Sequence, residues 1–425
     1  MMRSMGDRGN AGTVAVVGAG IVGVATAIRL RRAGRDVVLI DREGPAAGAS
    51  RGNGGVLASC AVVPVTTPGL LRRAPRMLLD PSGPLFLRWR HLPRMAPWLR
   101  RYLAHANARD AERAAAALAP LIGDSLEEHR ALAAGTGAER HVVPSDYVFH
   151  YASRAAFEDD RFAWDLRRAQ GFGWEEAEAR MVDPALPSGF AVRLGGHGRI
   201  DDPGAYVEAL AAHFRAVGGR VIRAEVEGLV RRDGRLAGVR VAGETVPCDA
   251  AVIATGAWSR SIAAQAGLDV PLESERGYHL ELWGPSAMPR APVMLTGAKV
   301  VATPMTGRLR LAGIVEFGGL DAPPSRAPFA LLRRAIRHAM PGLSWVRETE
   351  WMGHRPAPAD SIPVIGEAPE LPGAWFGFGH HHVGLTGGPA TGRLLAAMIT
   401  GARPNVDVTP YSPSRFARRR TKDPT

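Results

Sequence analysis

The chain has 425 residues, of which 46% are hydrophobic, so it can bury a large core and has room for two or three domains. Its formal net charge of +12, carried almost wholly by arginine, favours anionic substrates or membranes, but no nucleic-acid-binding motif accompanies it and we expect no nucleic-acid partner. The two cysteines, Cys60 and Cys248, form neither a disulfide framework nor a CxxC pair, which argues against structural zinc and is typical of a cytoplasmic protein.

The first predicted elements are a strand, a glycine-rich loop and a helix. Residues 14–17 are a valine-rich run, typical of a strand buried on both faces. The loop GAGIVG follows, with glycines spaced for a tight turn, for close approach of a pyrophosphate and for close packing of a helix. A membrane span over residues 13–30 is the alternative, but these glycines favour strand, loop and helix.

A second strand completes this unit. DVVLID follows the helix, and Asp41 closes it at the offset where an acidic side chain receives two ribose hydroxyls. A bare GxGxxG is weak evidence, but strand, loop, helix, strand and terminal acid in this order predict a dinucleotide site. The next stretch, residues 46–58, is dense in glycine and carries Ser50 and Asn53, so its backbone can run against a flat ring system. This favours FAD over NAD.

The middle of the chain predicts a basic surface segment, helices and a meander. Residues 68–105 interleave Leu, Met and Trp with arginines, which suits contact with an anionic membrane surface or a quinone. The alternative is a set of short helices covering the flavin, with Trp89 and Trp98 packed inward. Residues 108–135 predict a helical insertion, and residues 225–259 predict a β-meander that returns to a buried strand.

The last motif, GHHHVGLTGGP, begins with three adjacent histidines. Neighbouring side chains on a strand or helix point in different directions, so at most two of the three could converge on one ion, and we expect no metal site. The glycines that follow precede a helix-patterned run at residues 394–399, which fits a glycine-rich loop leading into a helix N-terminus. Such a loop presents backbone N–H groups to an electron-rich ligand.

In this order, the motifs GAGIVG, Asp41, ASRGNGG, VIATGAWS, HRPAPADSIPVIG and GHHHVGLTGGP make the chain resemble the D-amino-acid oxidase-like FAD superfamily. Within it the chain is most similar to bacterial D-amino-acid dehydrogenases. The resemblance implies an α/β fold with a Rossmann-like, glutathione-reductase-type FAD domain and a second α+β substrate domain built on an antiparallel sheet. Because Asn53 stands near the place where some relatives carry a flavin-linking histidine, we expect non-covalent FAD.

The resemblance also implies which residues hold the cofactor. The glycine loop would bind the pyrophosphate, the acid and its neighbour the adenosine side, and the two later loops the flavin. The expected set is Gly18, Gly20, Ile21, Val22, Gly23, Asp41, Arg42, Ser50, Asn53, Gly54, Gly55, Val226, Thr255, Gly256, Gly384, Leu385 and Thr386.

Three residues are expected at the reaction centre. Arg355 stands where the family places its carboxylate-binding arginine, a side chain whose fork matches a carboxylate. Tyr278 is expected to close over the substrate carboxylate or amine, and His381 to lie against the flavin or substrate. The implied reaction is oxidative deamination of a small neutral or cyclic D-amino or imino acid, with hydride passing from Cα to flavin N5.

One position at which the chain differs from its relatives bears on the electron acceptor. Arg310 occupies the position that we align with the oxygen-activating lysine of sarcosine oxidase-like relatives, which favours a quinone-type acceptor. The alternatives are an oxidase of sarcosine, glycine or another secondary amine, a 2-hydroxyacid oxidase or dehydrogenase, and a flavin-binding subunit that is inactive alone. A basic surface also makes peripheral attachment to the inner face of the plasma membrane an alternative to a free cytoplasmic state.

The expected organisation is a discontinuous FAD domain and a substrate domain. Residues 12–95, 196–268 and 352–412 form the first, residues 96–195 and 269–351 the second, and residues 1–11 and 413–425 are tails. The active site should lie between the flavin and the sheet of the substrate domain.

Overall fold

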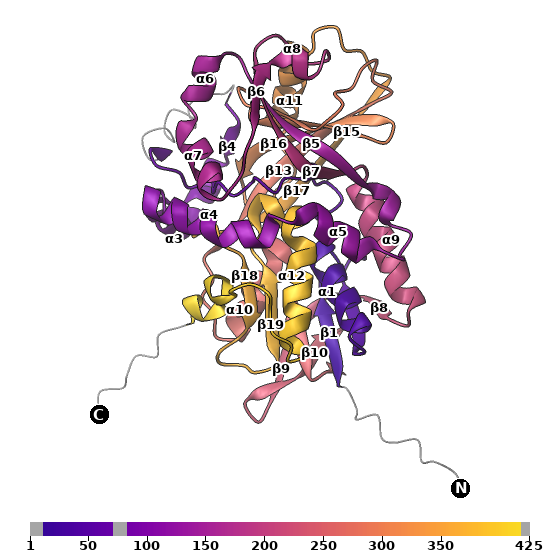
Figure 1. Ribbon diagram of the computed structural model, residues 1–425. Coiled ribbons are helices and arrows are strands. Elements are labelled where there is room, and N and C mark those ends of the chain that lie inside the picture. The colour runs from indigo at the N-terminus through magenta and orange to yellow at the C-terminus, as the bar shows by residue number, and fades with distance from the viewer. Residues whose placement is uncertain (1–11, 71–82, 418–425) are drawn as a thin grey trace.

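The computed structural model describes residues 12–70 and 83–417, and within them the chain forms two stacked bodies (Figure 1). Residues 71–82 of the basic segment, together with 1–11 and 418–425 of the expected tails, lie outside this description. The lower body contains the glycine loop, and the upper body contains a large sheet (Figure 1).

The lower body is built on a six-stranded sheet in the order β18-β19-β12-β1-β2-β8. Its central strands are parallel and fully buried, which matches their continuous apolar runs. The strands are β1 (Thr13–Val17), β2 (Asp36–Asp41), β8 (Arg220–Arg223), β12 (Ala250–Ile253), β18 (Val364–Glu367) and β19 (Ala374–Phe378).

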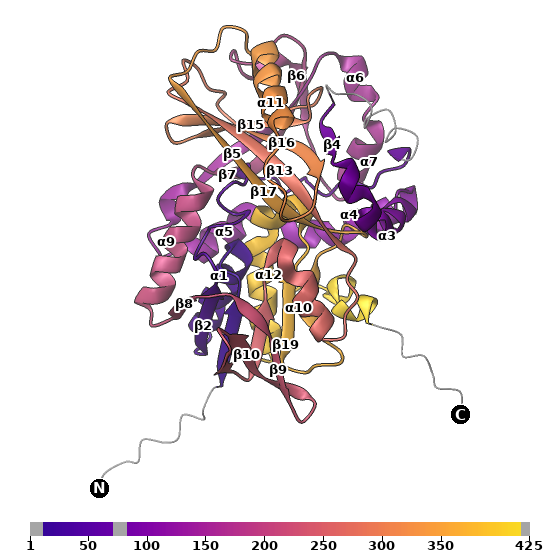
Figure 2. The same ribbon diagram turned by 180° about the vertical axis from the view of Figure 1, so that it is seen from behind.

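Each face of this sheet is covered differently. Helices α1 (Ile21–Arg32), α9 (Pro203–Ala216) and α12 (Gly384–Ile399) lie on one face (Figure 1). The other face carries α10 (Ser259–Gln265) and a three-stranded antiparallel meander, seen from behind in Figure 2. The meander strands are β9 (Val226–Arg232), β10 (Arg235–Val241) and β11 (Glu244–Pro247). The expected meander and glutathione-reductase-type layering are therefore confirmed.

The upper body is a ten-stranded sheet whose main path runs β17-β13-β16-β15-β14-β5-β7-β3. It is mostly antiparallel, as expected, but β14 pairs with β5 and β4 pairs with β16 in parallel. The strands are β3 (Val56–Leu57), β4 (Leu85–Leu87), β5 (Val142–Tyr151), β6 (Glu175–Glu178), β7 (Phe190–Ile200), β13 (Leu272–Trp283), β14 (Val293–Leu295), β15 (Val300–Met305), β16 (Arg308–Phe317) and β17 (Arg347–Pro358).

Helices surround this sheet and fill the space between the bodies. Helix α11 (Arg326–Ala339) packs on the face away from the lower body, while α6 and α7 pack at one end of the other face. The remaining helices are α3 (Leu92–Ala104), α4 (Ala108–Ile122), α5 (Ser125–Ala133), α6 (Arg154–Glu158), α7 (Arg161–Ala169) and α8 (Ala179–Val182). Helices α4 and α5 account for the expected insertion.

The sheet membership differs from the expected domain ranges at several points. The boundaries expected at residues 196 and 352 fall inside β7 and β17, which pair within the ten-stranded sheet on both sides of these positions. Strands β3 and β4, expected in the FAD domain, also belong to the upper sheet. The expected C-terminal tail begins later than residue 413, since Arg415 donates from Nη2 to the carbonyl of Ile362 (2.6 Å) and bonds the Asp360 carboxylate through Nε (2.9 Å).

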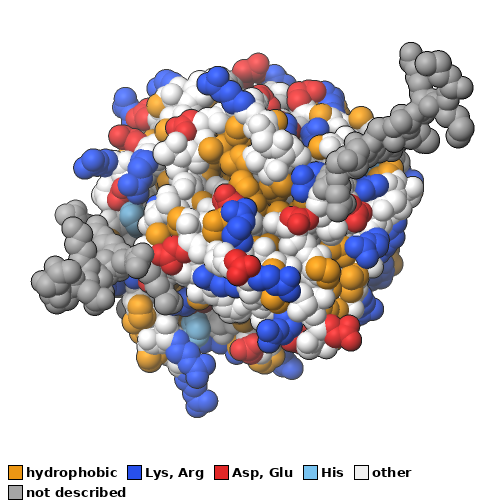
Figure 3. All heavy atoms as spheres, turned by 90° about the horizontal axis from the view of Figure 1, so that it is seen from below, with side chains coloured by type: hydrophobic (Ala, Val, Ile, Leu, Met, Phe, Trp, Pro, Cys, Tyr) orange, Lys and Arg blue, Asp and Glu red, His pale blue; other side chains and the backbone are white. Residues whose placement is uncertain are grey.

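Charges on the outer surface are mixed in sign. On the lower face, basic side chains are interspersed with aspartate and glutamate (Figure 3). No helix in the described part of the chain has the length and apolar character needed to span a membrane.

Candidate active site and cofactor cradle

The loop between β1 and α1 has a geometry that needs its glycines. Gly18 has φ +102°, and a Cβ there would lie 2.4 Å from the carbonyl oxygen of Ala254. A Cβ on Gly23 would lie 1.8 Å from the carbonyl oxygen of Gly18. Any larger residue at either position would push the helix away from the strands, so the loop can take this path only with glycine.

The start of α1 is open to an anion. Its first turn holds no acidic side chain, and the Ile21 amide donates to Oγ of Ser50 at 2.9 Å. The positive end of the helix dipole and the amides that follow Gly20, those of Val22 among them, therefore face the loop. This arrangement fits a pyrophosphate.

Asp41 ends β2 beside this loop and is already oriented. Its Oδ2 accepts from the Ala19 amide (2.8 Å), and its Oδ1 accepts from the amides of Glu43 (2.9 Å) and Gly44 (2.8 Å). Oδ1 thus accepts two bonds, whereas Oδ2 accepts one and keeps a lone pair, so the carboxylate can still receive a hydroxyl group. Arg42 is exposed, with its guanidinium 4.2 Å from the ring centroid of Trp258.

The return of the meander brings a third segment to the loop. Strand β12 runs beside β1 and ends at Ile253, so Thr255 and Gly256 follow directly next to Gly18. The Thr255 hydroxyl bonds the Ser259 hydroxyl (2.9 Å). Val226, at the start of β9, is half-buried on the meander that covers the other face of the sheet. The structure therefore gathers the expected nucleotide-binding segments along one edge of the parallel sheet.

Arg310 binds the backbone of the segment that is expected to lie along the flavin. Nη1 of Arg310 donates to the carbonyls of Arg51 (3.1 Å) and Asn53. Asn53 turns its own side chain back to the Gly55 amide (2.8 Å), and the Gly55 carbonyl accepts from the Ile200 amide on β7 (2.7 Å). Gly54 follows Asn53 in this stretch and is half-buried. The loop is thus clamped to the upper sheet.

The glycines near the C-terminus form helix, not loop, which corrects the expectation. Helix α12 begins at Gly384, so Leu385 and Thr386 already belong to its first turn. A Cβ on Gly388 would lie 2.9 Å from Cγ1 of Ile21, so these small residues serve close packing against α1 and not backbone freedom. The N-termini of both helices therefore open on the same region, and neither first turn holds an acid.

A buried carboxylate links two of the expected catalytic residues. Glu275 on β13 accepts from Nη1 of Arg355 through Oε1 (2.7 Å), and its Oε2 lies 2.9 Å from Nε2 of His381. The side chains of Glu275 and His381 are each only 4% exposed, whereas Arg355 is 23% exposed. His381 has φ +52°, a strained conformation for this residue that directs it toward the sheet.

A β-bulge in β16 completes the setting of Arg355. The pairing with β13 skips Ile314, which has φ +52°. The carbonyls of Gly313 and Ile314 accept from Nη2 (3.1 Å) and Nη1 (3.2 Å) of Arg355. Gly277 leaves room for the guanidinium, because a Cβ there would lie 2.5 Å from its Cζ.

The charges around Glu275 set its protonation. Burial alone would raise the pKa of this carboxyl, but His381 and Arg355 hold the pKa well below its usual range, so Glu275 is ionised. Tyr102 on α3 is buried nearby, and burial together with the charge of Glu275 raises the pKa of its phenol well above the usual value. Neither Glu275 nor Tyr102 was expected from the sequence.

Tyr278 lies elsewhere, in contrast to the expectation. It stands three positions after Glu275 on a regular strand, so its side chain points to the opposite face of the sheet. There it donates to Oε2 of Glu316 (2.5 Å), accepts from the Ser325 amide (3.0 Å) and packs edge-on against Phe329 of α11. The structure does not bring Tyr278 to Arg355.

The three adjacent histidines do not converge on one partner. Nε2 of His380 bonds the hydroxyl of Thr391 (2.8 Å), His381 meets Glu275, and Nδ1 of His382 lies 3.0 Å from Nδ1 of His381. Within the described residues no cluster has the composition of a metal site.

The basic segment covers this region through α3. Trp98 packs inward and donates from Nε1 to the carbonyl of Ala357 on β17 (3.0 Å), and it stacks on Tyr102 with ring centroids 4.4 Å apart. Trp89 instead is 61% exposed. The inward packing expected of both tryptophans therefore holds for Trp98 alone.

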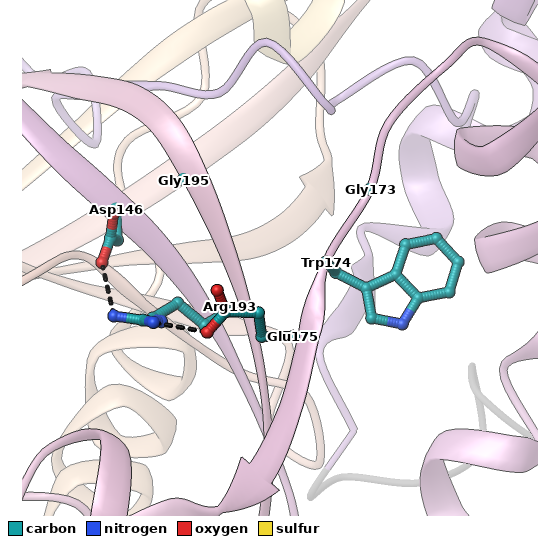
Figure 4. A pocket seen from close by; sticks show the side chains of 6 residues that line it. All are labelled: Asp146, Gly173, Trp174, Glu175, Arg193 and Gly195. Carbon is teal, nitrogen blue, oxygen red and sulfur yellow. Dashed lines mark hydrogen bonds and ion pairs between the residues drawn. The ribbon is translucent and has the colours of Figure 1, made fainter.

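A separate surface pocket of about 320 Å³ opens elsewhere on the upper sheet (Figure 4). Arg193 at its wall bonds the carboxylates of Asp146 and Glu175, and Gly173, Trp174 and Gly195 complete the lining. Its only basic lining residue is thus already neutralised, and none of the expected site residues borders it.

Comparisons with known proteins agree with this geometry. The D-amino-acid oxidase of Bradyrhizobium diazoefficiens is 39% identical over 95% of this chain and 98% of its own length. A D-amino acid dehydrogenase of the same organism is 28% identical over 96% and 99%. Among solved structures, glycine oxidase from Geobacillus kaustophilus has a TM-score of 0.73 at 22% identity, covering 95% of this chain and 98% of its own.

The L-proline dehydrogenase from P. horikoshii has the same fold, with a TM-score of 0.72 at 19% identity over 95% and 97% of the two chains. The expected α/β fold and the expected cofactor are confirmed. The family described as DAO, FAD dependent oxidoreductase, matches residues 13–398, and this chain belongs to it.

Proposed function

We propose that the chain holds FAD non-covalently and oxidises small neutral or cyclic D-amino or imino acids. The cradle formed by Gly18, Gly23, Asp41 and the N-termini of α1 and α12 supports the cofactor assignment. The names of the two Bradyrhizobium relatives support the substrate class.

The observation that carries the proposal is the free edge of Arg355. Nη1 is occupied by Glu275 and Ile314, and Nη2 gives one hydrogen to Gly313. Among the residues that the structure describes, none accepts from Nε. Nε and the second hydrogen of Nη2 lie on one side of the guanidinium and form a fork that a substrate carboxylate fits in bidentate fashion.

The protein's part in the reaction is then mainly orientation. Bound FAD supplies the acceptor for the hydride that leaves the substrate Cα. Arg355 fixes the substrate carboxylate, and the clamped loop at Asn53 keeps the cofactor side of the site in place. The helices α3 and α12 enclose the region, which excludes water.

For the electron acceptor we propose a quinone. Arg310 is tied to Glu281 through Nε (3.0 Å) and Nη2 (2.7 Å) and to the flavin-side loop through Nη1, so its charge is compensated and not free to attract superoxide. The exposed Trp89, with Arg90 and Arg94 exposed nearby, supports delivery from the inner face of a membrane. Residues 71–82 of this segment are outside the described structure.

A second candidate, oxygen as acceptor, is supported by the 39% identical relative, which is a D-amino-acid oxidase. A product assay separates the two. Purified holoenzyme with D-alanine or D-proline should form the keto or imino acid rapidly under nitrogen with a soluble quinone analogue, and slowly in air without it. Rapid peroxide formation in air would select the oxidase, and turnover of 2-hydroxyacids alone would contradict the proposed substrate class.

A further inference from the structure

The buried charge beside Arg355 bears on which amino acids the site accepts. Glu275 is 3% exposed and touches both Arg355 and His381, so it sits inside the region where the substrate carboxylate must bind. The hydrogen bond from Arg355 fixes its position, and the Coulomb attraction of His381 and Arg355 lowers the pKa of this carboxyl, which keeps it ionised. A substrate therefore enters a site that already contains one full negative charge.

The positive charges of the site can be counted against the negative charges of Glu275 and the substrate. Counted with the neutral amine from which hydride leaves, Arg355 and His381 contribute at most two positive charges, and Glu275 with the α-carboxylate of the substrate supplies two negative charges. A second carboxylate on the substrate would have no cation left to pair with. A neutral side chain leaves the site balanced.

In the described structure, the other arginines of this part of the sheet are already paired and cannot neutralise a second substrate carboxylate. Arg276 pairs with Glu316 at 2.8 Å on the opposite face. Arg310 pairs with Glu281 at 2.7 Å, and its Nη1 donates to the carbonyls of Arg51 and Asn53. A buried carboxylate without a partner cation is costly, because desolvation is not offset.

We propose that Glu275 is a specificity-determining residue that excludes dicarboxylic amino acids from the site. This rests on the proposed function, since it presumes that Arg355 binds the α-carboxylate. It assigns the exclusion of acidic side chains, which the proposed function only implies, to one residue.

The test compares two isosteric substrates, D-glutamine and D-glutamate, which differ only in the charge of the side chain. The quantity is the ratio of kcat/KM for D-glutamate to that for D-glutamine, in which flavin content cancels. In the wild-type holoenzyme, kcat/KM for D-glutamate should be lower than that for D-glutamine by about tenfold or more. This is the effect expected for one unpaired charge in a partly buried site. Equal values in the wild type would overturn the proposal without any variant.

Glu275→Gln removes the charge and keeps an oxygen for Arg355, so the ratio should rise by about tenfold. The matched control is Glu273→Gln, the same change two positions earlier on the strand, where the carboxylate bonds His91 instead of Arg355. Its ratio should stay at the wild-type value. A ratio that is unchanged in Glu275→Gln, or that rises equally in both variants, contradicts the proposal. Absence of turnover with every D-amino acid would instead contradict the proposed function.

Discussion

Arg355 owes its position to residues from other strands. Gly277 on β13 leaves space under the guanidinium, and the bulge at Gly313 and Ile314 turns two carbonyls toward it. Glu275 holds a third donor. The guanidinium is therefore fixed before any substrate arrives, which reduces the entropy lost on binding.

Replacing Arg355 with lysine should raise KM for amino acids about 100-fold, because the ammonium keeps the charge but loses the bidentate fork, an effect of about 3 kcal/mol. Steady-state kinetics of holoenzyme measure this, with flavin content determined in parallel. Arg347→Lys is the control, an exposed arginine on the same strand, and should leave KM unchanged. An unaltered KM in Arg355→Lys would remove this residue from substrate binding.

Tyr278→Phe should leave KM within about twofold and lower the free energy of unfolding by about 1–2 kcal/mol, because the lost hydroxyl leaves the buried Glu316 short of a donor. Denaturant unfolding and kinetics on the same preparation check both parts. A large rise in KM with unchanged stability would contradict this prediction and indicate that Tyr278 contacts the substrate.

At the residue level the sequence predicted Arg355, Asp41 and the glycine loop as site residues because each lies in a local motif with a fixed spacing. It could not identify Glu275, whose role depends on the pairing of β13 with β17 across about eighty intervening residues, a separation shown by its hydrogen bond to Arg355. The face on which Tyr278 lies depends on the same pairing. The sequence shows that side chains alternate between the two faces of this strand. It does not show which face lies toward the expected flavin site.

At the scale of elements, the close contact of α1 and α12 determines where both helix N-termini lie. A Cβ on Gly392 would come within 2.7 Å of the backbone carbon of Ala25 and the backbone nitrogen of Thr26. Backbone atoms cannot move aside as a flexible side chain can. The glycine in the middle of α12 is therefore required by packing, despite its low helix propensity.

Gly392→Ala should lower the free energy of unfolding by about 1–3 kcal/mol, through overpacking, and weaken FAD retention by displacing the N-terminus of α12. Thermal unfolding and flavin content after gel filtration measure the two effects. Gly342→Ala, at a position where a Cβ meets no atom within 4 Å, should change neither. Unchanged stability in Gly392→Ala would show that the helices separate freely.

Patterns in the sequence located most elements correctly but not their limits. The run Gly384–Thr386 was expected in a loop because glycine is common in loops, yet small residues also permit two helices to approach. Strands β7 and β17 extend through the expected domain boundaries, since a long strand can belong to one sheet while its ends reach another body. Their hydrophobic patterns do not reveal this.

For the whole molecule, buried neutral histidines predict sensitivity to acid. His129 is fully buried between Tyr206 and the carbonyl of Leu385, and burial lowers its pKa to about 4. An unfolded histidine has a pKa of about 6.5, so the unfolded chain binds a proton that the folded chain does not. Stability is full above about pH 6.5 and falls by up to about 1.4 kcal/mol per pH unit toward pH 4.

The melting temperature should therefore decrease between about pH 7 and pH 5, and His129→Gln should show a shallower decrease. Thermal unfolding across this range tests the expectation. His338→Gln is the control, because His338 is exposed on α11, and its curve should follow that of the wild type. Parallel curves for His129→Gln and the wild type would contradict the account.

The FAD cradle and Arg355 together should make this chain an oxidase or dehydrogenase of D-amino acids. The most direct test is anaerobic mixing of the purified holoenzyme with single D- and L-amino acids, sarcosine and 2-hydroxyacids while the visible absorbance of the flavin is followed. The account predicts rapid bleaching by neutral or cyclic D-amino acids and far slower bleaching by the L-isomers. Bleaching by 2-hydroxyacids alone, or a purified protein without flavin absorbance that cannot be reconstituted with FAD, would contradict it.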